Sequence, residues 1–397
     1  MIAVGLDIHK DKVFCGIHNG EKFLPVREYS TLTCEIRAMG EYLQQMKADK
    51  IAMESTGIYW IPIWNILEEM GFELILVNPY QIKQMPGRKS DVKDAQWIAL
   101  LLQKDLLRAS LVPDEHIREL RTYSRKYDKL QKRMTSLLQE MERTLEMCGI
   151  RITSYVSNIS SKSIRKVIDT IVEGTEDSEY LEELVHSRIR NKHKEKIRQS
   201  LEGCITEHHR FILELLRDEF SLLESQSEKC LGKMKTLCRE HYQQEMELLQ
   251  TIPGIGELSS MVIIAETGGD MKKFENSSKF TGWVGLRPRN DESAGKYKST
   301  AITKGNKHLK SALVQTAWGA TRIKGGYFKD KFTRLAMRKS QKKALIAIAR
   351  KIGVIIYCVL KEKKPFNPSL LPLYDPLRVQ RQIEYHQREW MRLSKLT

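Results

Sequence analysis

The first hundred residues alternate short apolar runs with stretches of helical spacing, which predicts a mixture of strands and helices. Residues 2–9 form an apolar run with β character, and residues 12–20 and 21–30 are the next two strands of a predicted meander. Beyond the meander, helices and strands alternate. The expected elements there are a helix over 34–48, a strand over 51–53, a helix over 59–70, a strand over 73–77 and a helix over 91–102.

Three strands followed by alternating helices and strands are the element order of the ribonuclease-H-like fold. In that fold parallel strands extend an antiparallel meander, and helices cover the faces of the sheet. We therefore predict an α/β domain of this class over residues 1–112. A polar loop over 81–89 precedes its last helix, and Ser90 is suited to cap that helix.

After Pro113 the pattern changes to long, charged helices with heptad-like apolar seams, over residues 113–247. The seams hold Tyr127, Leu130, Met134, Leu137 and Met141, and then Phe220, Leu223, Cys230, Met234 and Leu237, with Ser227 in the middle of the second. An antiparallel hairpin, a dimerising coiled coil and two amphipathic helices folded onto a domain all fit this pattern. Residues 151–200, between the seams, are expected to be polar and irregular.

A third, mainly α-helical region is predicted over residues 248–368, followed by a proline-punctuated, peripheral tail over 369–397. Near its start, residues 252–256 (IPGIG) resemble the turn of a helix-hairpin-helix. In such a turn, glycines let backbone N–H groups approach phosphate. A plain αα-hairpin turn, in which glycine supplies a positive φ, is the alternative.

Charge singles out this third region as the candidate nucleic-acid contact. The 397 residues carry a formal net charge of +16, and residues 272–364 hold 24 Lys and Arg against 5 Asp and Glu. Aromatic residues are interleaved with these cations, so both phosphate contact and base stacking are available. Trp318, in contrast, is expected in the core. The candidate contact residues are Arg287, Arg289, Lys296, Lys298, Lys304, Lys307, Lys310, Lys342 and Lys343.

Other features argue against several classes of protein. No apolar run approaches the roughly 20 residues that span a bilayer, and the N-terminus has no signal-peptide layout. The seven cysteines are scattered without a C-x-x-C pair, which argues against a zinc ribbon or a disulfide framework. We expect a cytoplasmic protein with no membrane partner.

Four carboxylates stand out by their positions in the predicted α/β domain. Asp7 interrupts the apolar first strand, Glu54 ends the fourth strand, and Asp91 and Asp94 share one face at the start of the last helix. In the ribonuclease-H-like arrangement these elements meet at one edge of the sheet, where four acids can hold hard divalent cations. Singly, each acid has a plain structural explanation: an edge-strand charge, a helix cap, or a first-turn acid favoured by the helix dipole.

Three segments surround these acids: residues 5–10 (GLDIHK), 53–60 (MESTGIYW) and 89–95 (KSDVKDA). Together they resemble the DEDD motif of insertion-sequence transposases of the 110 family, whose members are bridge-RNA-guided recombinases. The likeness spans roughly residues 1–366, without residues 151–200 and the tail. It continues through 252–256 (IPGIG), 280–288 (FTGWVGLRP), 303–306 (TKGN) and 344–351 (ALIAIARK).

The resemblance implies a RuvC-like domain, a coiled-coil linker and a separate transposase domain. It also implies a catalytic serine, which by position falls on Ser293 within residues 288–296 (PRNDESAGK). Many members have glycine directly after the serine, whereas Ala294 stands here. Activated by a base or a metal ion, the hydroxyl would attack a DNA phosphate and form a phosphoserine link. The alternative is a solvated turn serine in a polar loop.

We therefore predict a DNA transposase or recombinase that excises and inserts a mobile element. Asp7, Glu54, Asp91 and Asp94 would bind Mg²⁺, or Mn²⁺ in its place, and would form a composite site with Ser293. The expected partners are double-stranded DNA at the element ends and the target, and further copies of the chain in a dimer or tetramer. A guide RNA is implied by the resemblance alone, as is a bacterial or archaeal, nucleoid-associated location.

Two rival hypotheses remain open. One is a metal-dependent RuvC-like nuclease or junction resolvase in which Ser293 takes no part. The other is a non-enzymatic, nucleic-acid-binding scaffold that retains only the basic face.

Overall fold

The computed structural model divides the chain into two compact units, Met1–Pro113 and Asp114–Thr397, and each is described by itself. None of the helices in the described part of the chain is both long and apolar enough to cross a membrane. The structure describes residues 1–55, 57–79, 91–107, 109–110, 112–289, 291–293, 296–299, 301–371 and 376–394.

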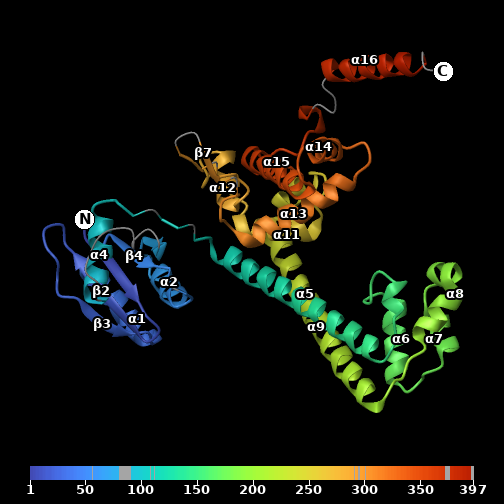
Figure 1. Ribbon diagram of the computed structural model, residues 1–397. Coiled ribbons are helices and arrows are strands. Elements are labelled where there is room, and N and C mark those ends of the chain that lie inside the picture. The colour runs from blue at the N-terminus through green and yellow to red at the C-terminus, as the bar shows by residue number, and fades with distance from the viewer. Residues whose placement is uncertain are drawn as a thin grey trace. The chain divides into compact units, whose positions relative to one another are not determined.

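The first unit is built on a five-stranded sheet (Figure 1). Its strands are β1 (Ala3–Ile8), β2 (Lys12–His18), β3 (Arg27–Ser30), β4 (Lys50–Glu54) and β5 (Leu74–Val77). They lie in the order β3-β2-β1-β4-β5, with antiparallel pairing from β3 to β1 and parallel pairing from β1 to β5. This mixed order confirms the predicted α/β ribonuclease-H-like fold.

β3 is shorter than the strand expected over residues 21–30. Pro25 has no N–H group to donate to a sheet ladder, and regular pairing with β2 begins only at Arg27. Before Pro25, one isolated bridge joins His18 and Phe23. The chain therefore reaches β3 through a loop rather than along a continuous strand.

Helices cover both faces of this sheet. α1 (Thr33–Gln45) and α2 (Trp60–Glu69) pack against each other on one face, and α4 (Asp91–Gln103) packs on β1 and β2 from the other. Alternate residues of β1 serve the two layers: Leu6 joins the core with α1 and α2, whereas Ala3 joins the core with α4. Asp7 shares the side of Ala3 and therefore faces the α4 layer.

Glycines let α4 approach the sheet closely. A Cβ on Gly5 would lie 2.2 Å from the carbonyl oxygen of Ala95, and a Cβ on Gly16 would lie 2.8 Å from the carbonyl carbon of the same residue. Any larger residue at these two positions would push the helix away. The two glycines therefore set how near α4 comes to β1 and β2 at Ala95, one turn after Asp91.

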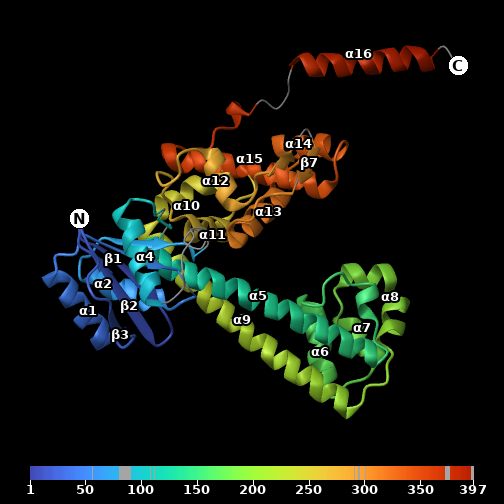
Figure 2. The same cartoon turned by 60° about the vertical axis from the view of Figure 1, so that its left-hand side comes forward.

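The second unit contains a long helical hairpin of α5 (Glu115–Met147) and α9 (Glu207–His241), which run antiparallel (Figures 1 and 2). Both predicted seams contribute to one core, which includes Leu137 of α5 and Phe220 of α9. Ser227 fits in this seam because its hydroxyl accepts a hydrogen bond from Gln131 Nε2 at 2.7 Å. The two seams thus pair within one chain, as in the hairpin interpretation.

Residues 151–200 are largely helical, and the expectation of an irregular insert is wrong. They include the 3₁₀ helix η1 (Ile152–Ser154), α6 (Lys162–Val172), α7 (Ser178–Leu184) and most of α8 (Ser187–Leu201). The buried residues of α6 have amphipathic helical spacing, and they are Ile164, Val167, Ile168 and Ile171. Charged residues on the outer faces dominate the composition and mask this spacing.

The rest of the second unit is mainly helical, as predicted, and carries one small β-hairpin. Most of its helices share a large core with the first turns of α5 and the end of α9. The elements are α10 (Gln243–Gln250), α11 (Glu257–Thr267), α12 (Ser277–Val284), β6 (Asp291–Ser293), β7 (Lys296–Ser299), α13 (Lys307–Arg322), α14 (Tyr327–Ala336), α15 (Gln341–Glu362), η2 (Pro368–Leu370) and α16 (Pro376–Leu393).

The turn at residues 252–256 uses a glycine for packing. Gly254 has a φ of +90°, and a Cβ on it would lie 2.5 Å from the carbonyl oxygen of Thr316 in α13. The close approach at Gly254 is therefore to another helix. This contact favours the αα-hairpin interpretation over a phosphate-binding turn at that residue.

Trp318 is 43% exposed, so the expectation that it lies in the core is wrong. The inward face of α13 is formed by Leu309, Leu313 and Ala317, and Trp318 follows one residue later, off that face. Its ring centroid lies 5.9 Å from that of Phe332. Trp318 thus packs on its outer neighbours instead of filling the interior.

Candidate active site

Asp7 and Glu54 lie at the carboxyl ends of two neighbouring parallel strands, Asp7 next to last in β1 and Glu54 last in β4. In the β1–β4 register Leu6 lies opposite Met53, so each acid follows the last paired residue at the same edge of the sheet. On the other side of β4, Glu54 lies opposite Val77 of β5. The side chain of Asp7 is only 13% exposed. The two acids therefore sit at the carboxyl ends of the central strands.

The first turn of α4 brings further acids to this edge. The Nε2 atom of His9 lies 3.1 Å from Oδ2 of Asp7 and 3.7 Å from Oδ1 of Asp91. One possible ligand atom from each of these three residues lies within 4.8 Å of the other two. The side chains of His9 and Asp91 are 50% and 56% exposed, so the cluster is open to solvent.

The pKa of Asp7 lies above its ordinary value. Partial burial is the largest cause of the rise, because it disfavours the charged form. His9 opposes the rise through its charge and its hydrogen bond, while the charges of Asp94 and Asp91 add to it. A cation placed among these groups would relieve both the burial cost and the repulsion.

The side chains present fit a divalent metal ion. Two carboxylates and an imidazole nitrogen converge from β1, the turn after it and α4. Carboxylate oxygens suit Mg²⁺ and Mn²⁺, and an imidazole nitrogen is also a common ligand of Mn²⁺-like transition metals. The observation that favours a metal over three hydrogen-bonding side chains is that two like-charged carboxylates meet here, with one ligand atom each from Asp7, His9 and Asp91 within 4.8 Å of the others. The acidic cluster thus supports the use of a divalent metal.

The four predicted acids differ in their placement. Asp7 and Asp91 belong to the cluster, and Asp94 lies in the same helical turn and acts on Asp7 through its charge. Glu54 has interactions of its own and lies outside the three-residue cluster of the described chain. No role was assigned to His9 from the sequence. Its position two residues after Asp7 was the only hint in the sequence that it could join the acidic cluster.

Ser293 ends β6, in the small β-hairpin of the second unit. It lies opposite Lys296 of β7, and the pairing is irregular between Asp291 and Glu292. Ala294 and the following glycine, where the sequence departs from the family pattern, fall outside the described residues, as does the side chain of Ser293. The backbone of Ser293 is therefore placed at the last pair before the hairpin turn.

The predicted nucleic-acid contacts gather around this hairpin and at two helix starts. Arg287 and Arg289 lie before β6, and Lys296 and Lys298 lie on β7, where their side chains fall outside the described residues. The other contacts lie before or within the first turns of α13 and α15. Exposed side chains are those of Arg287, Arg289, Lys304, Lys307, Lys342 and Lys343, and Lys310 is partly exposed.

Comparison with known proteins identifies the family. Residues 4–149 match a model described as "Transposase", and residues 246–333 match a model described as "Transposase IS116/IS110/IS902 family". The matched segments together span more than half of the chain, and they include the four acids and Ser293. The chain belongs to the IS110 family of DEDD transposases. The transposase is thus an enzyme of DNA transposition and recombination, and the predicted family is confirmed.

Relatives of this transposase include mobile-element and inversion proteins. It is 24% identical over 377 residues to the transposase for insertion sequence element IS1111A of Coxiella burnetii, covering 92% of this chain and 91% of the relative. It is 30% identical over 138 residues to the pilin gene-inverting protein of Moraxella lacunata, covering 34% and 42% of the two chains. These matches agree with a transposase or recombinase function.

Among solved structures, RuvC of T. thermophilus in complex with a Holliday junction substrate aligns with 28% of this transposase and 99% of that chain, at 17% identity and a TM-score of 0.22. The ribonuclease-H-like assignment rests instead on the strand order of the first unit.

Proposed function

We propose that this transposase excises and inserts a mobile DNA element, with Ser293 as the nucleophile and a metal site formed by Asp7, Glu54, Asp91 and Asp94. The observation that carries the proposal is the cluster of Asp7, His9 and Asp91 at the edge of the sheet. It supports a place for divalent cations beside the acids of the DEDD motif. Family membership supports DNA as the substrate.

In this proposal the first unit supplies the metal ligands. Asp7 and Asp91 hold Mg²⁺, and Mn²⁺ in its place, with Asp94 and Glu54 completing the acidic site and His9 as a further ligand or a hydrogen-bond partner. When bound, the metal stabilises negative charge on the phosphate and on the entering and leaving oxygens. The carboxylates would fix the position of the metal ion, and the edge of the sheet keeps Asp7 partly shielded from water.

Ser293 supplies the covalent step. Its Oγ forms a bond to the DNA phosphorus, and the bond from phosphorus to a deoxyribose oxygen breaks. The proton lost by the hydroxyl is balanced by the proton that the leaving oxygen takes up. Because the phosphoserine link conserves a phosphate ester bond, the strands can be rejoined by the reverse attack without ATP.

The regions of the chain divide these tasks. Residues 1–112 carry the acids, 113–247 form the helical linker, 248–368 carry Ser293 and the basic contacts, and 369–397 form the tail. We propose that two or four copies assemble on the element ends and the target DNA, and that a bridge RNA selects both. We propose that this activity takes place at the nucleoid of a bacterial or archaeal cell, where the DNA substrates lie.

The test is to incubate the transposase and its co-purified RNA with Mg²⁺ and element-end DNA. A protease-sensitive covalent protein–DNA adduct is expected with the wild-type chain and not with Ser293→Ala. Asp7→Ala should remove strand cleavage as well as the adduct. Cleavage that survives Ser293→Ala would show a metal-only nuclease, and salt-sensitive DNA binding without cleavage would show a scaffold.

A further inference from the structure

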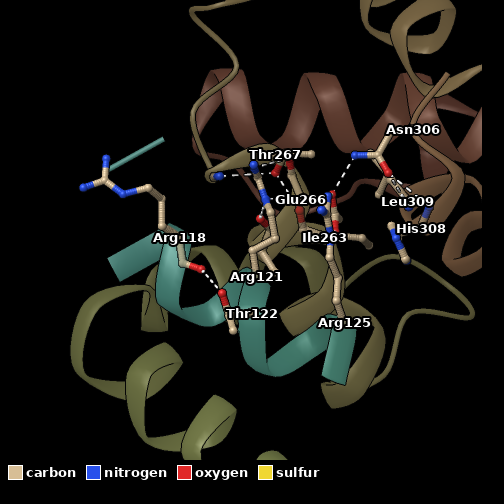
Figure 3. A network of polar contacts seen from close by, with 12 residues as sticks. Arg118, Arg121, Thr122, Arg125, Ile263, Glu266, Thr267, Asn306, His308 and Leu309 are labelled. Carbon is tan, nitrogen blue, oxygen red and sulfur yellow. Dashed lines mark hydrogen bonds and ion pairs between the residues drawn. The ribbon is translucent and has the colours of Figure 1, made fainter. Parts of the chain in front are cut away.

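A carboxylate outside the candidate active site lies fully buried in the second unit. Glu266, near the end of α11, is 0% exposed, and Arg125 of α5 donates to both of its oxygens at 2.9 Å (Figure 3). Nδ2 of Asn306 donates to the same carboxylate at 2.7 Å. Glu266 therefore joins three segments that are far apart in the sequence: α5, α11 and the loop before α13.

Arg121 completes the joint from one turn earlier on α5. Its Nε donates to the carbonyl oxygen of Ala265 at 3.0 Å, and its terminal nitrogen donates to that of Glu266 at 3.1 Å. Burial alone would raise the pKa of Glu266, but the hydrogen bonds from Arg125 and Asn306 outweigh it, and the pKa is lowered. Glu266 is thus ionised at neutral pH and is paired by the chain's own cations.

Asn306 connects this joint to the loop that leads out of the β-hairpin. Its Oδ1 accepts hydrogen bonds from the backbone N–H groups of His308 and Leu309 and so caps α13. Its own backbone N–H donates to the carbonyl oxygen of Trp283 at 3.1 Å. The side chain of Asn306 therefore has two tasks, which are to cap α13 and to contact Glu266.

The same loop forms the base of the hairpin that carries Ser293. The N–H of Thr303 donates to the carbonyl oxygen of Arg287 at 2.9 Å, and the N–H of Arg289 donates to that of Ala301 at 3.0 Å. Two hydrogen-bonded steps thus lead from the Asn306 loop toward β6 and β7. Gly305 fits tightly here, since a Cβ on it would lie 2.4 Å from the carbonyl oxygen of Trp283. The base has little room to shift without moving the hairpin.

We infer that Glu266 is a positioning residue: through Arg125 and Asn306 it fixes the base of the Ser293 hairpin to the long α5–α9 helical hairpin. The inference rests on the proposed role of Ser293 as nucleophile. An apolar contact at this junction would tolerate sliding, whereas a bidentate ion pair with a third hydrogen bond defines one arrangement.

The closing experiment compares Asn306→Ser with Asn276→Ser. Serine is a good N-cap, so Asn306→Ser keeps the cap of α13 but is too short to reach Glu266. Asn276 caps α12 by accepting from the N–H of Lys279 at 2.9 Å, and it takes no part in the Glu266 joint. The two substitutions are therefore matched in chemistry and in capping role, and they differ in the contact with Glu266.

Two readouts separate positioning from general stability. Amide hydrogen exchange at Arg289 and Thr303 should become about tenfold faster in Asn306→Ser, since the base of the hairpin loses its anchor. Adduct formation at Ser293 should slow about 100-fold, the effect of a small misplacement of a reacting group. Asn276→Ser should leave both unchanged. Asn306→Ser should also unfold at a somewhat lower temperature, because the buried carboxylate of Glu266 loses a hydrogen bond, so the two variants are compared at a temperature at which both are fully folded.

Unchanged exchange at the hairpin base in Asn306→Ser overturns the inference, as does an adduct rate that falls only in proportion to the folded fraction. Arg125→Lys gives an independent check, because lysine keeps the charge and loses the bidentate geometry. It should reproduce the faster exchange and slower adduct formation. A wild-type chain that forms no adduct, with exchange altered as expected, overturns the serine mechanism and not the link from Glu266 to the hairpin.

Discussion

Asp7 and Glu266 are two acids of one chain that are held in opposite ways. Asp7 is partly buried beside further acids and one histidine, and its pKa is raised. Glu266 is more deeply buried, yet hydrogen bonds from Arg125 and Asn306 hold its pKa below the ordinary value. Burial alone therefore does not decide whether a carboxylate is easily protonated, because the charges and hydrogen-bond donors around it can outweigh the effect of burial.

The difference separates a binding site from a structural joint. At Glu266 the chain itself provides the compensating charge, so the carboxylate is stable as it stands and can fix the geometry. The cluster around Asp7 is open to solvent and carries acids that repel one another, so it gains stability when a cation arrives. Removing the charge of Asp7 should therefore reduce mainly activity, whereas removing the charge of Glu266 should reduce mainly stability.

The largest expected effect is on catalysis, from Asp7→Asn. Metal-dependent strand cleavage should fall at least about 100-fold, because the cluster loses a ligand. The free energy of unfolding without metal should stay within about 0.5 kcal/mol or rise, since a poorly compensated charge is removed. Cleavage assays with Mg²⁺ and Mn²⁺, together with denaturant unfolding, measure the two quantities.

Asp11→Asn is the matched control for this substitution. Asp11 is an exposed acid in the turn after β1 and lies outside the cluster formed by Asp7, His9 and Asp91 in the described chain. It should leave cleavage unchanged. An equal loss of cleavage in both variants would mean that cleavage depends on the total negative charge at this edge of the sheet. It would contradict a specific metal site at Asp7.

Glu266→Gln should have the largest effect on stability. It leaves Arg125 and the more buried Arg121 without their counter-ion, and it should lower the free energy of unfolding by about 3 kcal/mol. The matched control is Glu257→Gln on the same helix, where Glu257 pairs with Lys235 at the surface at 2.7 Å. That change should cost no more than about 0.5 kcal/mol. Equal losses would remove the distinction between the two carboxylates.

Acid titration of stability sharpens the same comparison. The pKa of Glu266 is lowered in the folded state, so its contribution is fully present above the unfolded-state pKa of about 4.3. It is lost as the pH falls through the lower folded-state pKa. The stability difference between wild type and Glu266→Gln should therefore be constant near neutral pH and shrink below about pH 4. A difference that grows in acid contradicts the assignment of Glu266 as an ionised, paired group.

Local pattern was sufficient for most of the α/β unit. The apolar runs at residues 2–9, 51–53 and 73–77 correspond to β1, β4 and β5, because a buried strand must be apolar over its whole length. Pro25 shows the limit of such pattern reading. Residues 21–30 have a pattern that suits a strand, but Pro25 lacks an N–H group, and β3 begins only at Arg27. In residues 151–200 the charged composition hid the helical spacing of the buried residues of α6, which are Ile164, Val167, Ile168 and Ile171.

The candidate site was only partly accessible to such reasoning. Asp7 stood out because a charge in an apolar strand is conspicuous, and Asp91 because it opens a helix. His9 did not, since a single exposed histidine at the end of a strand has many explanations. Glu266 lies in an apolar helix, and its partner Arg125 is 141 residues away in the sequence. No local pattern reports a pair of that kind, because the fold alone brings the two together.

The smallest expected effect concerns the basic region around Ser293. Lys307 and Lys342 are exposed at the starts of α13 and α15. If each contacts a phosphate, Lys307→Gln and Lys342→Gln should each lower the slope of log affinity against log salt concentration by about one. Fluorescence anisotropy with element-end DNA over a salt series measures this slope.

Lys279→Gln provides the control for that series. Lys279 is exposed on α12 within the same basic stretch, but it lies 3.9 Å from Glu275 and was not among the predicted contacts. Its slope should match that of the wild type. If all three variants lower the slope equally, DNA affinity depends on the total charge of the region. The prediction of specific phosphate contacts at Lys307 and Lys342 is then wrong. If only Lys307→Gln and Lys342→Gln do so, each of these two lysines contacts a phosphate.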